Sequence, residues 1–541
     1  MEAERFSENE RRLLAPYFTN LDGPVFALRN LPEVVKGALF ARYSRSAKSL
    51  RRLFLDEFLD TVAEGSHAAE VGVGRADKLY ERVFDEYGDD SVAQLGGAHL
   101  ACEGASNILT KVLEWGRLMA YLEQSTRYIA YNDRCGEQWK YLVPTELEQH
   151  ADLRRRYVDC LDRAFETYAR WIEPIESHYR NKYPKDPVDA DSVYKRTIRA
   201  KALDTLRGLL PAATQSNVGL FGTGQAYEAL LLRMRVHPLH EVRTYADLML
   251  SELREVIPSF LKRVDRADRG VRWSDYLRAT HEATATIAKH TFQTDAAVAE
   301  ISIGTAAAGA RPEVVLTDFD LDGEAKVVAA ALYAVSDLPD DQLLSIVRAL
   351  SDEQRASVLR AYVGERQNRR HKPGRAFERT TYRFDILTDY GAFRDLQRHR
   401  LLTLEWQPLS PGHGYGVSEA IHEAGALADW QRIMDESAAL HHALVAAGLP
   451  DVAPYAVSMA FRVRFYMEMN AREAMHMIEL RTAPQGHPSY RRVCQTMHKL
   501  IAEQAGHRAI AAAMVFADHS EVELERLRAE RAGEKRRQGQ G

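Results

Sequence analysis

Cysteine is scarce in this sequence and is spread widely along it. The 541 residues contain four cysteines, Cys102, Cys135, Cys160 and Cys494. No two of them form a C-x-x-C pair, which a structural zinc site requires, and their spacing is not that of a disulfide framework. Histidines that lie near each other in the sequence also lack the H-E-x-x-H spacing of a catalytic zinc helix. We therefore expect neither disulfide bonds nor a metal site.

Long apolar runs and an excess of basic residues are also missing. No window of about 18 uncharged apolar residues exists, so no segment is predicted to span a membrane. The opening residues MEAERFSENERR lack the apolar core of a signal peptide, which favours a cytoplasmic protein. The 72 basic residues are outnumbered by 77 acidic ones, giving a net charge of −5. A protein that binds nucleic acid over its whole surface is usually basic. We therefore expect neither membrane nor nucleic acid as a partner, although a local basic pocket is compatible with this balance.

The sequence does contain helical periodicity and one clear strand. Residues 324–336 and 492–516 carry apolar side chains three and four positions apart, which predicts helices. In TYRFDIL (381–387) apolar and charged residues alternate, which predicts a half-buried strand. A small sheet among long helices indicates the α+β class.

The two halves of the chain resemble each other. Residues 201–243 and 444–491 both run from Leu-Pro through an apolar helical segment that ends in arginine to His-Pro. This pattern predicts two similar domains. The alternative is that two unrelated helical domains share these pairs by chance. The predicted parts are a first domain (20–265), a helical connector (266–294), a second domain (295–520) and a disordered charged tail (521–541).

The densest cationic cluster in an apolar setting consists of Arg394, Arg398, His399 and Arg400. Burying several cations together is costly, so an anion must compensate them. Phosphate is a good candidate, because guanidinium groups bind it in a bidentate fork. The alternative interpretation is a solvated charged turn.

A second polar cluster lies in YLEQSTRY, which includes Glu123, Ser125 and Arg127. In an extended segment this alternate spacing aims all three side chains to one side. A hydroxyl group and a guanidinium group two residues apart could then hold a phosphate. The alternative is a surface loop.

These segments resemble motifs of the flavin-dependent thymidylate synthases. The sequence RHR at 398–400, followed by Leu401, Leu402 and Thr403, resembles the head of the family's Arg-His-Arg motif. EQSTRY (123–128) resembles the tail of the same motif. MNAREAMHMIELR (469–481) and RGLLP (207–211) resemble two further family segments. The second half thus keeps the head of the motif and the first half keeps its tail, which implies composite sites built from both halves.

The resemblance implies two domains of the family's type, each with a small mixed or antiparallel sheet and long helices, and it implies the family's chemistry. This is FAD-dependent methylation of dUMP to dTMP, with methylene-tetrahydrofolate and NADPH as co-substrates, in a homodimer whose four domains imitate the family's tetramer. Alternatives are a non-catalytic flavin- or nucleotide-binding protein on the same fold and a flavin enzyme for another pyrimidine. The implied cofactor residues are Arg398, His399, Arg400, Asn470, Arg472 and His476. The implied substrate residues are Glu123, Gln124, Ser125, Arg127, Arg207 and Arg398, with Arg235 or Arg481 at the uracil ring.

Overall fold

The chain folds into two compact units, and neither unit is continuous in sequence. The computed structural model describes residues 6–23, 26–43, 46, 48–59, 94–134, 136, 138–294, 312–524 and 526–538. Unit 1 comprises Met1–Ala105, Val112–Glu123 and Asn217–Ala299, and unit 2 comprises Ser106–Lys111, Gln124–Ser216 and Glu300–Gly541. Residues 124–216, which the sequence repeat assigns to the first half, therefore pack with the second half. The domain ranges drawn from the repeat stay a prediction.

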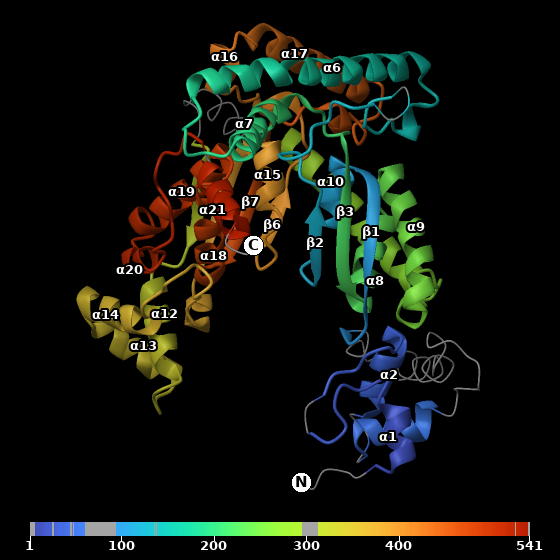
Figure 1. The fold of residues 1–541 in the computed structure, drawn as a ribbon, viewed down its shortest axis with the longest axis vertical. Helices are drawn as coiled ribbons and strands as arrows, with labels where there is room; N and C mark the ends of the chain where they lie inside the picture. Colours follow the sequence, from blue (N-terminus) through green and yellow to red (C-terminus); the bar gives the residue numbers. More distant parts are fainter. Residues whose placement is uncertain are drawn as a thin grey trace. The chain divides into compact units, whose positions relative to one another are not determined.

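Unit 1 is built on a small sheet with strand order β1-β3-β2, in which β2 and β3 are antiparallel. The side chain of Thr223 accepts a hydrogen bond from Ala226 N–H and so caps helix α8, which begins directly after β3. The strands are β1 (Gly97–Ser106), β2 (Met119–Glu123) and β3 (Gln215–Thr223). The other elements are α1 (Glu8–Leu14), α2 (Glu33–Tyr43), α3 (Leu50–Leu53), η1 (Phe54–Phe58), α5 (Asn107–Leu113, shared with unit 2), α8 (Gly224–Arg235), α9 (His240–Val256), η6 (Pro258–Leu261) and α10 (Gly270–Thr294). Helix α10 covers most of the predicted connector (Figure 1).

Unit 2 contains an antiparallel sheet with strand order β4-β5-β7-β6. Its strands are β4 (Val314–Phe319), β5 (Thr381–Asp389), β6 (Thr403–Trp406) and β7 (Arg462–Asn470). The predicted strand at 381–387 is confirmed as part of β5. Its alternate residues Tyr382 and Phe384 are fully buried and lie opposite Met469 and Met467 of β7. With the sheet of unit 1, this confirms the α+β class and the expectation of two small sheets among long helices.

Helices from both halves of the chain pack within unit 2. Helix α6 lies along α16 and α17 (Figure 1). Arg163 of α6 binds Glu436 of α17 at 2.8 Å, and Arg170 binds Asp429 at 2.6 Å. The helices are η4 (Thr145–Leu147), α6 (Ala151–Lys182), α7 (Asp191–Leu206), η5 (Arg207–Leu209), α12 (Gly323–Tyr333), α13 (Asp340–Ala349), α14 (Asp352–Val363), η7 (Arg375–Arg379), α15 (Tyr390–Leu396), η8 (Pro411–His413), α16 (Glu419–Glu423), α17 (Leu427–Ala446), η9 (Ala453–Ala456), α18 (Ala471–Arg481), α19 (Pro488–Glu503), α20 (Arg508–Ala512) and α21 (Leu527–Gln538). Within the described ranges no helix has an apolar stretch long enough to cross a bilayer.

Of two helices predicted in unit 2, one is continuous and one is interrupted. The helix predicted at 324–336 is α12. The helix predicted at 492–516 is interrupted, because Gly506 adopts a φ of 73° that ends α19 before α20 begins. Helix α21 lies in the charged tail (521–541), and its Arg531 donates to the Asp189 carboxylate at 2.8 Å. This pairing joins the tail to a distant part of unit 2, and a composition-based prediction has no access to it.

Candidate functional site

A buried carboxylate, Asp395, lies among several arginines in unit 2. It stands near the end of α15 and only 7 % of its surface is exposed. Arg398, three residues further on, donates to its carboxylate, while Arg207 Nη1 and Arg481 Nη1 lie 3.6 and 3.7 Å from its oxygens. Arg481 also donates to the backbone carbonyl of Asp395. Burial opposes ionisation, but the arginines outweigh it and hold the pKa of Asp395 well below its usual range.

Arg127 of the first half belongs to the same network. Its Nε and Nη2 atoms donate to the two carboxylate oxygens of Asp204 at 2.8 and 2.7 Å, and its Nη1 donates to the Tyr490 hydroxyl at 3.0 Å. Burial lowers its pKa, but Asp204 outweighs this effect, so the net pKa is raised and the charge is retained. The Arg481 guanidinium lies 5.5 Å from the centroid of the same Tyr490 ring. Tyr490 therefore connects Arg127 with the arginines around Asp395.

The segment that supplies Arg127 is not extended as expected. Strand β2 ends at Glu123, which belongs to unit 1, and the chain then turns, with the backbone N–H of Tyr128 bonded to the Ser125 carbonyl at 3.2 Å. The Ser125 hydroxyl accepts a hydrogen bond from the Arg127 N–H at 3.3 Å. Gln124 is half-buried, and its carbonyl accepts from Ser216 at 3.3 Å. A turn intervenes, so the condition for three side chains on one side of an extended segment is not met.

A second buried carboxylate, Glu473, lies between two histidines. His399 Nδ1 is 3.0 Å from one of its oxygens and His476 Nδ1 is 3.2 Å from the other. Burial raises the pKa of Glu473, but these hydrogen bonds outweigh it and lower the pKa to about 2. His399 Nε2 accepts from Arg481 Nε at 3.0 Å, which fixes the proton on Nδ1. Burial, aided by the Arg481 charge, lowers the His399 pKa to about 4, so the ring is neutral. Both ring nitrogens of His399 are therefore engaged in hydrogen bonds.

The other predicted cofactor residues surround the start of α18. Asn470 caps this helix by accepting from Glu473 N–H at 2.9 Å. Arg472 donates to the Pro373 carbonyl at 3.0 Å, and Arg400 is exposed. The side chains of Arg398, Arg472 and His476 are about one-third exposed, at 29, 31 and 29 %.

Arg235, predicted at the uracil ring, lies in α8 of unit 1. Its Nη1 atom is 3.7 Å from Asp247, and its side chain is 30 % exposed. The other arginine predicted for that role, Arg481, lies in the unit 2 network.

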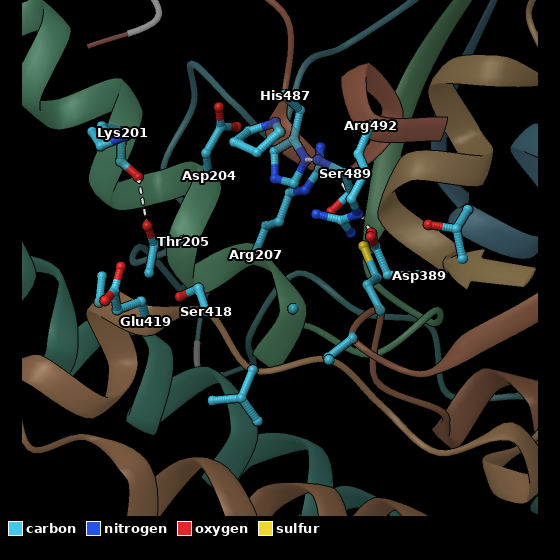
Figure 2. A pocket seen from close by; sticks show the side chains of 18 of the residues that line it. Lys201, Asp204, Thr205, Arg207, Asp389, Ser418, Glu419, His487, Ser489 and Arg492 are labelled. Carbon is cyan, nitrogen blue, oxygen red and sulfur yellow. Dashed lines mark hydrogen bonds and ion pairs between the residues drawn. The ribbon is translucent and has the colours of Figure 1, made fainter. Parts of the chain in front are cut away.

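A cavity of about 890 Å³ borders the arginine network (Figure 2). Arg207, Asp204, Asp389 and His487 line it together with residues of α7, α16 and α19. Arg207 is 4 % exposed, and its Nη2 atom finds no hydrogen-bond acceptor among the residues the structure describes. A carboxylate oxygen of Asp389 lies 4.0 Å from this atom, beyond hydrogen-bond distance. A buried donor without an acceptor at the wall of a cavity is suited to an anionic or carbonyl ligand.

Sequence reasoning missed the acidic side of this network. Asp395 lies three residues before Arg398, and Asp204 lies three residues before Arg207. On a helix this spacing places Asp395 beside Arg398, so it was a usable signal for internal compensation of that cation. Asp204 instead binds Arg127, 77 positions away, and Tyr490 binds the same arginine across 363 positions, so neither pairing had a local signal. Glu473 and His476 lie three residues apart and carried a local signal, whereas the bond of Glu473 to His399 did not.

The fold and the site together define an α+β protein with a buried, charge-paired arginine network drawn from two similar halves. Residues 38–259 and 316–505 match the thymidylate synthase complementing protein family, and the chain belongs to this family. It is 38 % identical to a UPF0159 protein of Chlamydia muridarum, over 97 % of this chain and 98 % of that protein. It is 24 % identical over 178 residues to a flavin-dependent thymidylate synthase of Clostridium tetani, which is 32 % of this chain and 66 % of that protein.

One solved structure also shows similarity. It is a UMP/dUMP methylase, PolB, from Streptomyces cacaoi bound with 5-Br dUMP. The match covers 37 % of this chain and 94 % of that chain, with 18 % sequence identity and a TM-score of 0.28. A similarity of this size is too low to indicate a shared activity.

Proposed function

We propose that this protein is a flavin-dependent methyltransferase that converts dUMP to dTMP, with methylene-tetrahydrofolate as the one-carbon donor and NADPH as the reductant. Family membership supports the reaction class. The observation that carries the proposal is the meeting of both halves in one site. Arg127 and Arg207 come from the first half, Arg398 and Arg481 come from the second, and all four act on Asp395 beside a cavity.

The substrate is assigned to the side of the network that faces the cavity. Arg207 would donate to the nucleotide phosphate, and we assign Arg127, Ser125 and Gln124 to the substrate as well. Methylation at C5 of uracil is difficult because this carbon is a weak nucleophile. Negative charge on the ring must be stabilised as the reaction proceeds, and a fixed guanidinium group can do this without reorganising. We assign that role to Arg481, which Asp395, His399 and Tyr490 hold in place.

The residues around the start of α18 fit an anionic cofactor such as FAD. The guanidinium groups of Arg398, Arg400 and Arg472 keep exposed surface, and guanidinium is well suited to a diphosphate linker. His399, Asn470 and His476 hold the same region in shape through their bonds to Glu473. When bound, the flavin would supply hydride, and the protein would position and tune it.

A second candidate is a flavin- or nucleotide-binding protein without turnover. Asp395 favours it, because a network whose cations are already compensated binds an added anion less tightly. A flavin enzyme for another pyrimidine would use the same residues. For each of these functions we propose a homodimer. Its four domains would form two pairs, each made of one first half and one second half.

Tritium release from 5-labelled dUMP, with NADPH and methylene-tetrahydrofolate, tests the proposal on purified protein together with its flavin absorption spectrum. Arg207→Ala should lower kcat/KM by about 100-fold or more, the usual size of a lost charge-stabilising donor. Arg155→Ala is the matched control, because this arginine is 72 % exposed and pairs only locally with Asp152; it should stay within about twofold of the parent protein. Flavin and dUMP binding without tritium release would support the binding protein instead. Absence of both would reject the proposal, and rescue of a thymidine-auxotrophic strain would test it in cells.

A further inference from the structure

The arginine network contains carboxylates of the protein itself, Asp204 and Asp395. Asp204 accepts hydrogen bonds from Nε and Nη2 of Arg127. Asp395 accepts from Arg398 and lies within 4 Å of Arg207 and Arg481. Among the described residues, Nη2 of Arg207 is a buried guanidinium nitrogen without a hydrogen-bond acceptor, and it lies in the wall of the cavity, 4.0 Å from Asp389. The centre of the network is occupied by the Asp395 carboxylate, whereas the cavity side keeps a buried donor that no carboxylate reaches within hydrogen-bond distance.

We propose that Asp395 is the resident anion of this network and sets which part of a ligand the arginines can bind. It excludes a phosphate group from the centre of the four arginines and restricts phosphate to the Arg207 side facing the cavity. The inference narrows the substrate assignment made above and rests on the proposed function for the identity of the ligand. Its physical basis is that a phosphate dianion and a buried carboxylate repel each other strongly where little water separates them.

Asp395 lies on a helix that is held in place by its packing. All seven residues of α15 are buried, and the Asp389 side chain caps its first turn by accepting from Ala392 N–H at 2.8 Å. Arg207 lies against the backbone of the same helix at Gly391. A Cβ atom added there would come within 2.9 Å of Arg207 Nε, so the close approach requires glycine. The helix that carries Asp395 and the arginine it compensates are thus packed together.

Inorganic phosphate is the probe, because its binding can be measured without turnover. Titration calorimetry at constant ionic strength, with chloride as the reference salt, should give weak phosphate binding to the parent protein. Asp395→Asn keeps the shape of the side chain and removes its charge. We expect this variant to bind phosphate at least 10-fold more tightly and to gain a phosphate-dependent rise in Tm that the parent lacks.

Two further variants separate the role of Asp395 from a general loss of negative charge. Asp395→Glu keeps the carboxylate and should bind phosphate within about threefold of the parent. Asp389→Asn removes the acid 4.0 Å from Arg207 Nη2 while leaving the centre occupied, so it should tighten phosphate binding less than Asp395→Asn does. If Asp395→Asn is too unstable to purify in chloride, its yield and Tm are compared after refolding in phosphate and in chloride.

Rescue of Asp395→Asn by phosphate alone supports the proposal. Equal phosphate affinity in the parent and in Asp395→Asn overturns the proposal. So does an Asp395→Asn variant that folds in neither salt. A variant that folds equally well in both salts but does not bind phosphate overturns it too. The result of this phosphate test is independent of the test of the proposed function. A protein that releases no tritium but whose Asp395→Asn variant gains phosphate binding rejects the methyltransferase and keeps this inference.

Discussion

Unit 2 contains two buried carboxylates, Asp395 and Glu473, and different partners keep each of them ionised. Asp395 is surrounded by guanidinium groups, which stay charged at every accessible pH. Glu473 is bonded to the imidazoles of His399 and His476. Arg481 joins the two regions by donating to the Asp395 carbonyl and to His399 Nε2. The Asp395 region therefore keeps its charge state when the pH changes, whereas the Glu473 region contains a group that titrates.

The difference also separates two kinds of stabilisation. Around Asp395, opposite permanent charges compensate one another, and removing one partner leaves the others buried without compensation. Around Glu473, the bond to His399 joins an ionised acid to a neutral ring, so less charge is exposed by its loss. Three experiments test this contrast.

Replacing Asp395 should have the largest effect. Asp395→Ala leaves Arg207, Arg398 and Arg481 without their shared counter-ion and should lower the free energy of unfolding by about 3–5 kcal/mol. Urea denaturation followed by circular dichroism measures it. Glu468→Ala is the control, because Glu468 pairs with Arg383 where both side chains are well exposed, and this loss should stay below about 1 kcal/mol. Equal losses for the two variants would contradict the buried role of Asp395.

The second-largest effect should be a loss of folding stability at acid pH that depends on His399. Its pKa of about 4 in the folded protein lies below the value of about 6.5 in an unfolded chain. The unfolded state therefore binds more protons between these values, so the stabilisation is fully present above pH 6.5 and is lost as the pH falls toward 4. The loss is on the order of 3 kcal/mol for this group.

His399→Gln isolates the contribution, because His487 and other groups whose pKa is lowered act in the same direction in both proteins. Glu473, Arg481 and His476 face the ring and remain in both. Unfolding free energies measured from pH 7 to pH 4 should fall less steeply in the variant. Parallel curves would show that His399 does not contribute.

Replacing Glu473 should have the smallest effect of the three. Glu473→Gln keeps one acceptor oxygen but loses the charge-assisted bonds to the two histidines, so we expect a loss of about 1–3 kcal/mol in the free energy of unfolding. The effect should also shrink below pH 4.5, where the acid begins to be protonated in the unfolded chain. A loss larger than that of Asp395→Ala would reverse the comparison.

Local features of the fold could be predicted from the sequence because they depend on neighbouring residues. The alternation of Tyr382, Phe384 and Ile386 sets one face of β5, and all three are fully buried. The apolar spacing at 324–336 predicted α12. The break at Gly506 was missed, since periodicity on both sides of it continues and only the backbone conformation ends the helix.

The candidate site was predicted only in part. The cluster at Arg398–Arg400 required an anion, and the sequence pattern favoured phosphate for that role. The anion found there is Asp395, three residues away. Arg481 meets His399 across 82 positions and Arg127 meets Asp204 across 77, and no local pattern contains such pairs.

The sequence by itself determined which segments become helices and strands, that two similar halves carry complementary motif residues, and that buried cations need a counter-charge. The tertiary structure decided which charges meet. Packing residues 124–216 with the second half brings Arg127 and Arg207 to Asp395, and the low dielectric of that interior makes each pairing strong. Periodicity is a property of neighbours along the chain, whereas charge compensation depends on distances that exist only after folding.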